Sequence, residues 1–370
     1  MPHRKTSESS TGDAMADCVL PLDMIALHRF KSVCKPLRDV LSSPEFAKMH
    51  RAQFPLNPEN QSVVIYRHFV ICHHTVSLLK IETDEEKKPT DLDIPFSQDY
   101  DIAQFVGCCN GLLCLAFIRR SQFIALWNPA LNNMIKYIPF PDLKVEGPAM
   151  LSSLGFGYNE EADDFKVIII VELEKNKEIR VEVYSSNSNS WSTIDVGFRF
   201  TVLRHRNSVI VNGSPYWLAM VDEKHFMIVC FDVRKMVFKV LPLPKFIVKG
   251  VRTVMLVDLK GDLGVLVCKQ KKDETVLSFD IWVFDDAGKN GWTKNRSFGP
   301  IELKVYRFLH CSKNGKILVG KYLEFGKVVV LDTESGGVEE IVIDEFQRGA
   351  FQIHDYTESL AYIKGMETLL

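Results

Sequence analysis

The chain has 370 residues, of which 46% are hydrophobic and 25% charged, as in an ordinary globular protein that buries its core without disulfides or metal. Lys and Arg number 45 against 47 Asp and Glu, so the net charge of −2 excludes the strongly basic composition of nucleic-acid and membrane binders. Since we find neither a signal peptide nor an aliphatic run near the ~20 residues that span a bilayer, we expect a protein of the cytoplasm and/or nucleus, with no membrane and no nucleic acid as partner.

The N-terminal part of the chain changes from polar to helical in character. Residues 1–17 are rich in Ser, Thr and charge, which predicts a disordered tail. In residues 18–54, apolar side chains recur at helical spacing on one face: Leu27, Phe30, Cys34, Leu37 and Leu41. Pro36 lacks a backbone donor, so a helix should stop or kink just before it. A second helix start follows, with Ser43 as N-cap and Pro44 as first helical residue.

From about residue 61, short runs of Val, Ile, Phe and Tyr alternate with Gly, Asn and Asp turns, which predicts strands. Two turn signals repeat in this region, the first at intervals of about fifty residues and the second ahead of four of its five occurrences. The first is a polar residue between two strands, at Asn128, Ser185, Asp232, Asp285 and Asp332. The second is a Gly that leads into a strand, at Gly111, Gly213, Gly261 and Gly315.

Two hairpins in about fifty residues are typical of a four-stranded propeller blade. An earlier strand pair, within residues 62–81, raises the number of units to about six. Each small sheet can bury its faces only against its neighbours, so the ring must close. We therefore predict a mainly β fold, a kelch-like β-propeller of about six blades after a short helical segment. A pair of stacked antiparallel sheets is the alternative.

The order of motifs resembles that of plant F-box proteins with an F-box-associated, kelch-like domain. LPLDMI (20–25), LHRFKSVCK (27–35) and SSPEFAKMH (42–50) resemble parts of an F-box. VGCCNGLLCL (106–115) and LWNPALNNMIKYIP (126–139) resemble the first signatures of the associated domain, and six further motifs follow in order as far as YTESL (356–360). The resemblance implies a truncated F-box at 18–54 and an F-box-associated propeller at 61–363.

The same resemblance implies the substrate-recognition subunit of an SCF-type cullin-RING ubiquitin ligase. In that family the F-box binds a Skp-type adaptor, and through it a cullin, while the propeller binds a target protein. Such a subunit is not an enzyme and needs no cofactor, because it only holds a target lysine near a ubiquitin-charged enzyme on another subunit. No residue of this sequence identifies the target or the propeller face that binds it.

The F-box-like stretch contains our candidates for the adaptor-binding face: Leu20, Pro21, Ile25, Leu27, Phe30, Val33 and Leu37. Apolar residues at helical spacing also form cores, so some of them are equally expected to pack the helices against the propeller. About eleven residues of the family's first helix are missing here, which removes part of an interface that should bury at least about 1,000 Å². The second hypothesis is therefore a propeller interaction protein, a decoy, scaffold or relic, that has lost adaptor binding.

Catalytic and metal-binding patterns are weak in this sequence, and we predict neither. GxSxG, HExxH and Walker motifs do not occur. Cys72 and His73, like Cys108 and Cys109, are neighbours in strands and should point to opposite faces rather than toward one metal ion. An enzyme on a propeller, the third hypothesis, would need acids or metal ligands that converge in the central channel.

The pattern of the cysteines and of the tryptophans indicates structural roles for both. Nine cysteines, an odd number mostly in apolar runs, predict buried free thiols in a reducing compartment. The tryptophans lie near the repeated motifs and predict packing between blades: Trp127, Trp191, Trp217, Trp282 and Trp292.

Overall fold

The structure is a computed structural model of the chain. It describes residues 16, 18–20, 26, 27, 30, 33–41, 43, 46, 49, 50, 62–69, 74–80, 88–94, 103–118, 122–131, 134–143, 149–173, 178–203, 208–221, 225–244, 251–270, 276–285, 291–302, 307–313, 315–320, 327–342 and 349–368. Of the predicted disordered tail only Ala16 is described, and it is helical and buried. Across the described ranges, no helix combines the length and the apolar character that crossing a membrane requires.

Among the described residues of the helical segment, residues 18–54, the chain breaks its helix just before Pro36 and a helix cap lies at Ser43, as the sequence signals predict. Helix α3 (Lys35–Leu41) places Pro36 in its first turn, where the missing N–H costs no hydrogen bond. Ser43 caps the following helix, because the backbone N–H of Phe46 donates to Ser43 Oγ at 3.1 Å. Phe46 is buried in this helix, whereas Met49 is exposed.

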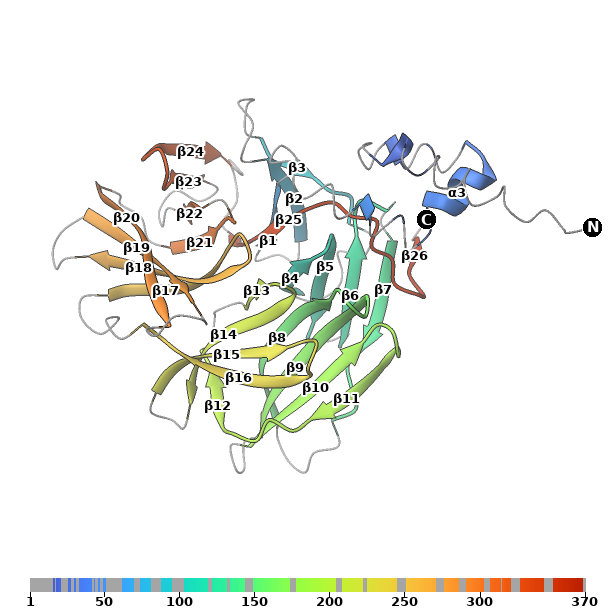
Figure 1. The fold of residues 1–370 in the computed structure, drawn as a ribbon, viewed down its shortest axis with the longest axis horizontal. Helices are drawn as coiled ribbons and strands as arrows, with labels where there is room; N and C mark the ends of the chain where they lie inside the picture. The colour runs from blue at the N-terminus through green and yellow to red at the C-terminus, as the bar shows by residue number, and fades with distance from the viewer. Residues whose placement is uncertain are drawn as a thin grey trace, which may run out of the picture.

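The strands form six antiparallel sheets arranged in a ring (Figure 1). From the inner strand outward, the first blade is β25 (Gly349–Tyr356), β1 (Ser62–Phe69), β2 (His74–Lys80) and β3 (Thr90–Asp91). The second is β4 (Ala103–Cys109), β5 (Leu112–Phe117), β6 (Phe123–Asn128), β7 (Met134–Pro139) and β26 (Glu367–Thr368). The third is β8 (Ala149–Asn159), β9 (Asp164–Leu173), β10 (Ile179–Ser185) and β11 (Ser190–Ile194).

The fourth blade has two short strands, β12 (Phe200–Val202) and β13 (Val209–Val211), that both pair with β14 (Ser214–Val221), followed by β15 (His225–Asp232) and β16 (Val237–Pro242). The fifth is β17 (Val251–Leu259), β18 (Asp262–Gln270), β19 (Val276–Phe284) and β20 (Trp292–Glu302). The sixth is β21 (Arg307–Cys311), β22 (Lys316–Gly320), β23 (Lys327–Asp332) and β24 (Val338–Val342). The prediction of a six-bladed propeller is confirmed, and the two-sheet alternative is wrong.

The ring closes because the last strands of the chain pair with strands of the first two blades. β25 pairs antiparallel with β1, with Ile353 opposite Ile65, so the last inner strand completes the first blade. The chain then crosses to the second blade, where Glu367 of β26 pairs with Ile135 of β7. The second pairing covers the outer edge of β7, which would otherwise be open to pairing with other chains.

The repeated Gly signal marks the turn between the first two strands of a blade. Asn212 and Gly213 both have positive φ, 48° and 75°, as a two-residue type I′ hairpin turn requires. The turn also contacts the blades on both sides of it. Tyr158 N–H of the preceding blade donates to the carbonyl of Gly213 at 2.8 Å, and Asn212 Nδ2 donates to the carbonyl of Gly261 of the following blade at 2.8 Å. At Asn212 and Gly213 the turn therefore forms both the hairpin and the contact between blades.

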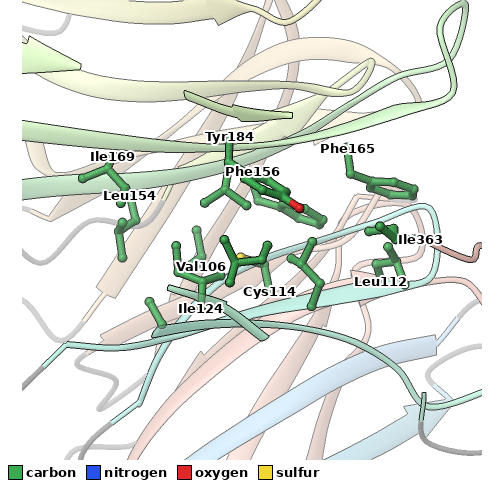
Figure 2. Close-up of a cluster of buried hydrophobic side chains, with 14 of the residues drawn as sticks. Val106, Leu112, Cys114, Ile124, Leu154, Phe156, Phe165, Ile169, Tyr184 and Ile363 are labelled. Carbon is green, nitrogen blue, oxygen red and sulfur yellow. The ribbon is translucent and has the colours of Figure 1, made fainter. Parts of the chain in front are cut away.

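Side chains packed between blades form the cores, as the tryptophan pattern predicts. Figure 2 shows one such core, with Val106 and Ile124 of the second blade facing Leu154 and Tyr184 of the third. Tryptophan indoles add hydrogen bonds across these junctions: Trp191 to the Pro139 carbonyl (3.0 Å), Trp217 to Leu154 (3.1 Å) and Trp292 to Pro242 (2.7 Å). Within the described ranges the cysteines are free thiols, most of them partly or fully buried, as expected.

Candidate functional site

The helical segment lies against the second blade and the C-terminal segment of the chain (Figure 1). Their contact is one buried apolar cluster, which we call the docking cluster: Ala16, Val19, Leu20, Leu27, Leu41, Phe46, Leu131 and Leu360. Leu131 comes from the turn between β6 and β7, and Leu360 follows β25. Burying a leucine or phenylalanine contributes about 1.5–3 kcal/mol, so a cluster of this size attaches the helical segment to the propeller.

Polar side chains of the second blade fix the C-terminal segment under this cluster. The buried Asn128 donates from Nδ2 to the carbonyls of Ser359 (3.0 Å) and Ala361 (2.8 Å). Lys136 Nζ donates to the carbonyl of Lys364 at 2.7 Å. Backbone carbonyls that are buried need such donors, so these bonds hold Leu360 in place.

The structure divides the predicted adaptor-binding residues into two groups. Leu20 and Leu27, the latter 0% exposed, are buried in the docking cluster, and Leu37 packs against it. Phe30 and Val33 are exposed, by 37% and 67%. Pro21 and Ile25 lie outside the described residues. Helical spacing alone did not separate the residues that face the propeller from those that face solvent.

A second candidate site is the central channel, a cavity of about 1170 Å³ between the inner strands of all six blades. Its lining includes Asp258 at the end of β17, Lys313 after β21 and Asp355 on β25. Lys313 Nζ lies 3.3 Å from Asp258 Oδ2, and His310 Nε2 lies 3.2 Å from Asp355 Oδ1. No sequence pattern singled out these residues, since they lie in three different repeats.

Burial controls the protonation of the groups in the channel. It raises the pKa of Asp258, although Lys313 and the Gly261 N–H oppose this effect. Although the Lys313 side chain is partly exposed, desolvation of its ammonium group by itself lowers the pKa, but Asp258 and Asp355 outweigh this effect and the pKa is raised. Burial also lowers the pKa of His354 to about 3 and raises that of Cys109 to about 12. Near pH 7 the His354 ring and the Cys109 thiol are therefore uncharged.

The channel contains acids and histidines, so it is not the purely apolar channel that would argue against an enzyme. Its thiols are protonated and hence weak nucleophiles. Among the residues that the structure describes, no three metal-ligating side chains are grouped as a metal site would require. The arrangement suits the binding of a polar group better than covalent chemistry.

Comparison with known proteins places the chain in a family. Residues 62–362 match the family model of the F-box associated beta propeller domain. An F-box/kelch-repeat protein of Arabidopsis thaliana is 26% identical over 299 residues, 76% of this chain and 77% of that protein. A putative F-box protein of the same plant is 23% identical over 381 residues, 95% of this chain and 94% of that protein.

Among solved structures, the Dos1 propeller is 12% identical, with 83% of this chain and 68% of that chain covered and a TM-score of 0.36. AofleA from Arthrobotrys oligospora is 9% identical, with 82% and 94% covered and a TM-score of 0.40. These likenesses are too small to add to the argument. The match over residues 62–362 is decisive, and the chain belongs to the family of plant F-box proteins with an F-box associated beta-propeller domain.

Proposed function

We propose that this protein is the substrate-recognition subunit of an SCF-type cullin-RING ubiquitin ligase. The helical segment binds a Skp-type adaptor, and the propeller binds a target protein. The observation that carries the proposal is the helical segment itself, which is attached to a family-typical propeller and still exposes Phe30 and Val33. The protein is non-catalytic in this role and takes no cofactor.

The docking cluster gives this role a physical basis. Because the cluster joins the helical segment to the second blade, the adaptor and the target are held at a fixed separation. A ubiquitin ligase accelerates ubiquitin transfer by holding a target lysine near the enzyme that carries ubiquitin. A rigid link between adaptor and target therefore accelerates transfer more than a flexible one does. Aromatic residues such as the exposed Phe30 are enriched at protein interfaces.

Co-expression with a plant Skp-type adaptor and the N-terminal part of a cullin tests the proposal. We expect the three chains to co-purify in one stoichiometric complex at high salt. A propeller that is folded by circular dichroism and elutes without the adaptor would overturn the role of the helical segment.

One observation favours the second candidate, a propeller interaction protein without adaptor binding. Leu20 and Leu27, at positions that the F-box resemblance assigns to the adaptor, are buried against the propeller. In that case the target would still bind, but no adaptor would be found in the complex, and the same co-purification separates the two candidates.

A further inference from the structure

The central channel has an excess of negative charge. Among the described residues that line it, the formally charged side chains are Asp258, Lys313 and Asp355, two acids and one base. His310, beside Asp355, carries a charge only when it is protonated. The channel therefore contains one lysine for two carboxylates, and these carboxylates come from different blades.

Geometry places these groups where a ligand from solvent can reach them. Asp258 is only 5% exposed, and its Oδ1 accepts the Gly261 N–H at 2.8 Å. Lys313 is exposed, and Asp355 is partly exposed. A ligand from solvent can therefore reach Lys313 and Asp355 first, and the buried carboxylate of Asp258 lies behind them.

Unsatisfied polar atoms line the same channel. Ser208 is 5% exposed, and within the described structure its hydroxyl has no hydrogen-bond partner. The same holds, among described atoms, for Nε2 of His354, which also lines the channel. Buried polar groups are normally hydrogen-bonded, and exceptions call for a ligand or an ordered water. An apolar ligand would leave these groups unpaired, and an anion would be repelled by the acids.

We propose that the channel binds a guanidinium or alkylammonium group, supplied by an arginine or lysine side chain of the bound target protein. The cation lies against Asp355 and Asp258 and shares them with Lys313. Arginine fits best, because its five N–H donors can reach two carboxylates at once and its charge is independent of pH. This inference rests on the proposed function, since a captured target is what presents the side chain.

A small probe tests the site directly on the full chain. The probe is Nα-acetyl-L-argininamide, and the matched control is Nα-acetyl-L-citrullinamide, which has the same shape without the charge. Binding is followed by the ¹³Cε1 resonances of labelled histidines, because His310 and His354 line the channel. We expect saturable shifts of both resonances with the arginine probe and at least about threefold weaker binding of the citrulline probe. No saturable shift, or equal affinities, would overturn the proposal.

Two variants with opposite effects identify the channel as the site. Asp355→Asn removes an attracting charge and should weaken the arginine probe at least about threefold. Lys313→Gln removes the competing cation and should strengthen it by a similar factor. Asp262→Asn and Lys260→Gln change the net charge equally at exposed positions outside the channel, so they should leave affinity nearly unchanged. Equal effects of Asp355→Asn and Asp262→Asn would assign the binding to general surface charge.

Two further measurements test where the cation comes from and keep that question apart from the test of the proposed function. Spermidine and free L-arginine carry the same chemistry as small molecules, and tighter binding of either than of the blocked probe would overturn a protein side chain as occupant. Both channel variants should still co-purify with the Skp-type adaptor, because the docking cluster is elsewhere. Failure of wild-type protein to bind the adaptor would contradict the proposed function and leave the probe result standing.

Discussion

Leu27 of the helical segment and Leu360 of the C-terminal segment lie in one buried cluster, although more than three hundred residues separate them in the sequence. Leu131, in the turn between β6 and β7, completes the contact from the propeller side. Segments far apart in the sequence thus meet on one blade. This contact turns a helical segment and a propeller into one body, which a receptor needs if it is to hold an adaptor and a target in fixed positions.

Removing Leu360 from the docking cluster should release the helical segment without unfolding the propeller. In Leu360→Asp a buried leucine is replaced by a charge, which we expect to cost at least about 3 kcal/mol of docking free energy. Hydrogen exchange of residues 18–50 is the measurement, and their amides should exchange much faster in the variant. Tyr362→Asp, two residues along and exposed, is the matched control and should exchange like the wild type. Equal exchange in the two variants would contradict the docking.

The two-residue turn at Asn212 and Gly213 should tolerate no side chain at its second position. A Cβ at Gly213 would lie 2.1 Å from the Tyr158 carbonyl oxygen of the neighbouring blade, and φ is +75°. Gly213→Ala should therefore lower the free energy of unfolding by at least about 3 kcal/mol, through strain and loss of the contact between blades.

A matched control for this turn exists at Gly197. Its φ is +74°, and a Cβ there would meet no described atom within 4 Å. Gly197→Ala reports the backbone strain alone, which should cost about 1 kcal/mol. Urea unfolding measures both variants, and similar losses for the two would show that the approach to Tyr158 contributes nothing.

Asp280 should make the stability of the fifth blade depend on acid pH. Burial alone would raise its pKa, but hydrogen bonds from Lys269, Lys294 and Ser297 outweigh burial and lower the pKa to about 2. The folded pKa lies below the unfolded value of about 3.9, so this stabilisation is present above about pH 4 and is lost as pH falls through about 2. Its size is on the order of 1–2 kcal/mol, since both lysines are partly exposed.

Urea unfolding of wild type and Asp280→Asn at several pH values measures this contribution. The difference in unfolding free energy between them should be largest near pH 6 and should shrink between pH 4 and pH 2. The exposed Asp262→Asn, in the neighbouring strand β18, should show almost no difference at any pH. A wild-type advantage that is constant with pH would show that the carboxylate charge is not what Asp280 contributes.

The sequence predicted those features of the fold that depend on local backbone demands. Gly213 and Asp232 mark turns because short polar residues and positive φ are needed wherever two strands reverse direction. Since these demands recur in most of the blades, their spacing predicted the period, and the strand pair within residues 62–81 added the sixth unit. The tryptophans were predicted to pack between blades, and the indoles of Trp191, Trp217 and Trp292 each donate to a carbonyl of the preceding blade.

Features that depend on ring closure were beyond the sequence. Asp258, Lys313 and Asp355 come together only because three inner strands meet at the axis, and no local pattern links them. Leu27 and Phe30 have the same helical spacing, yet one is buried and the other exposed. Only the position of the second blade and of the C-terminal segment separates their roles.

The affinity of the purified chain for a purified Skp-type adaptor tests most directly whether this propeller protein is a ligase receptor. Isothermal titration should give a single site for wild type and for Phe226→Asp, an exposed aromatic on β15 that serves as the matched control. Phe30→Asp should bind at least about tenfold more weakly, because a charge replaces an aromatic contact at the interface. No binding by the wild type, or equal binding by Phe30→Asp and Phe226→Asp, would contradict adaptor binding through the exposed face of the helical segment.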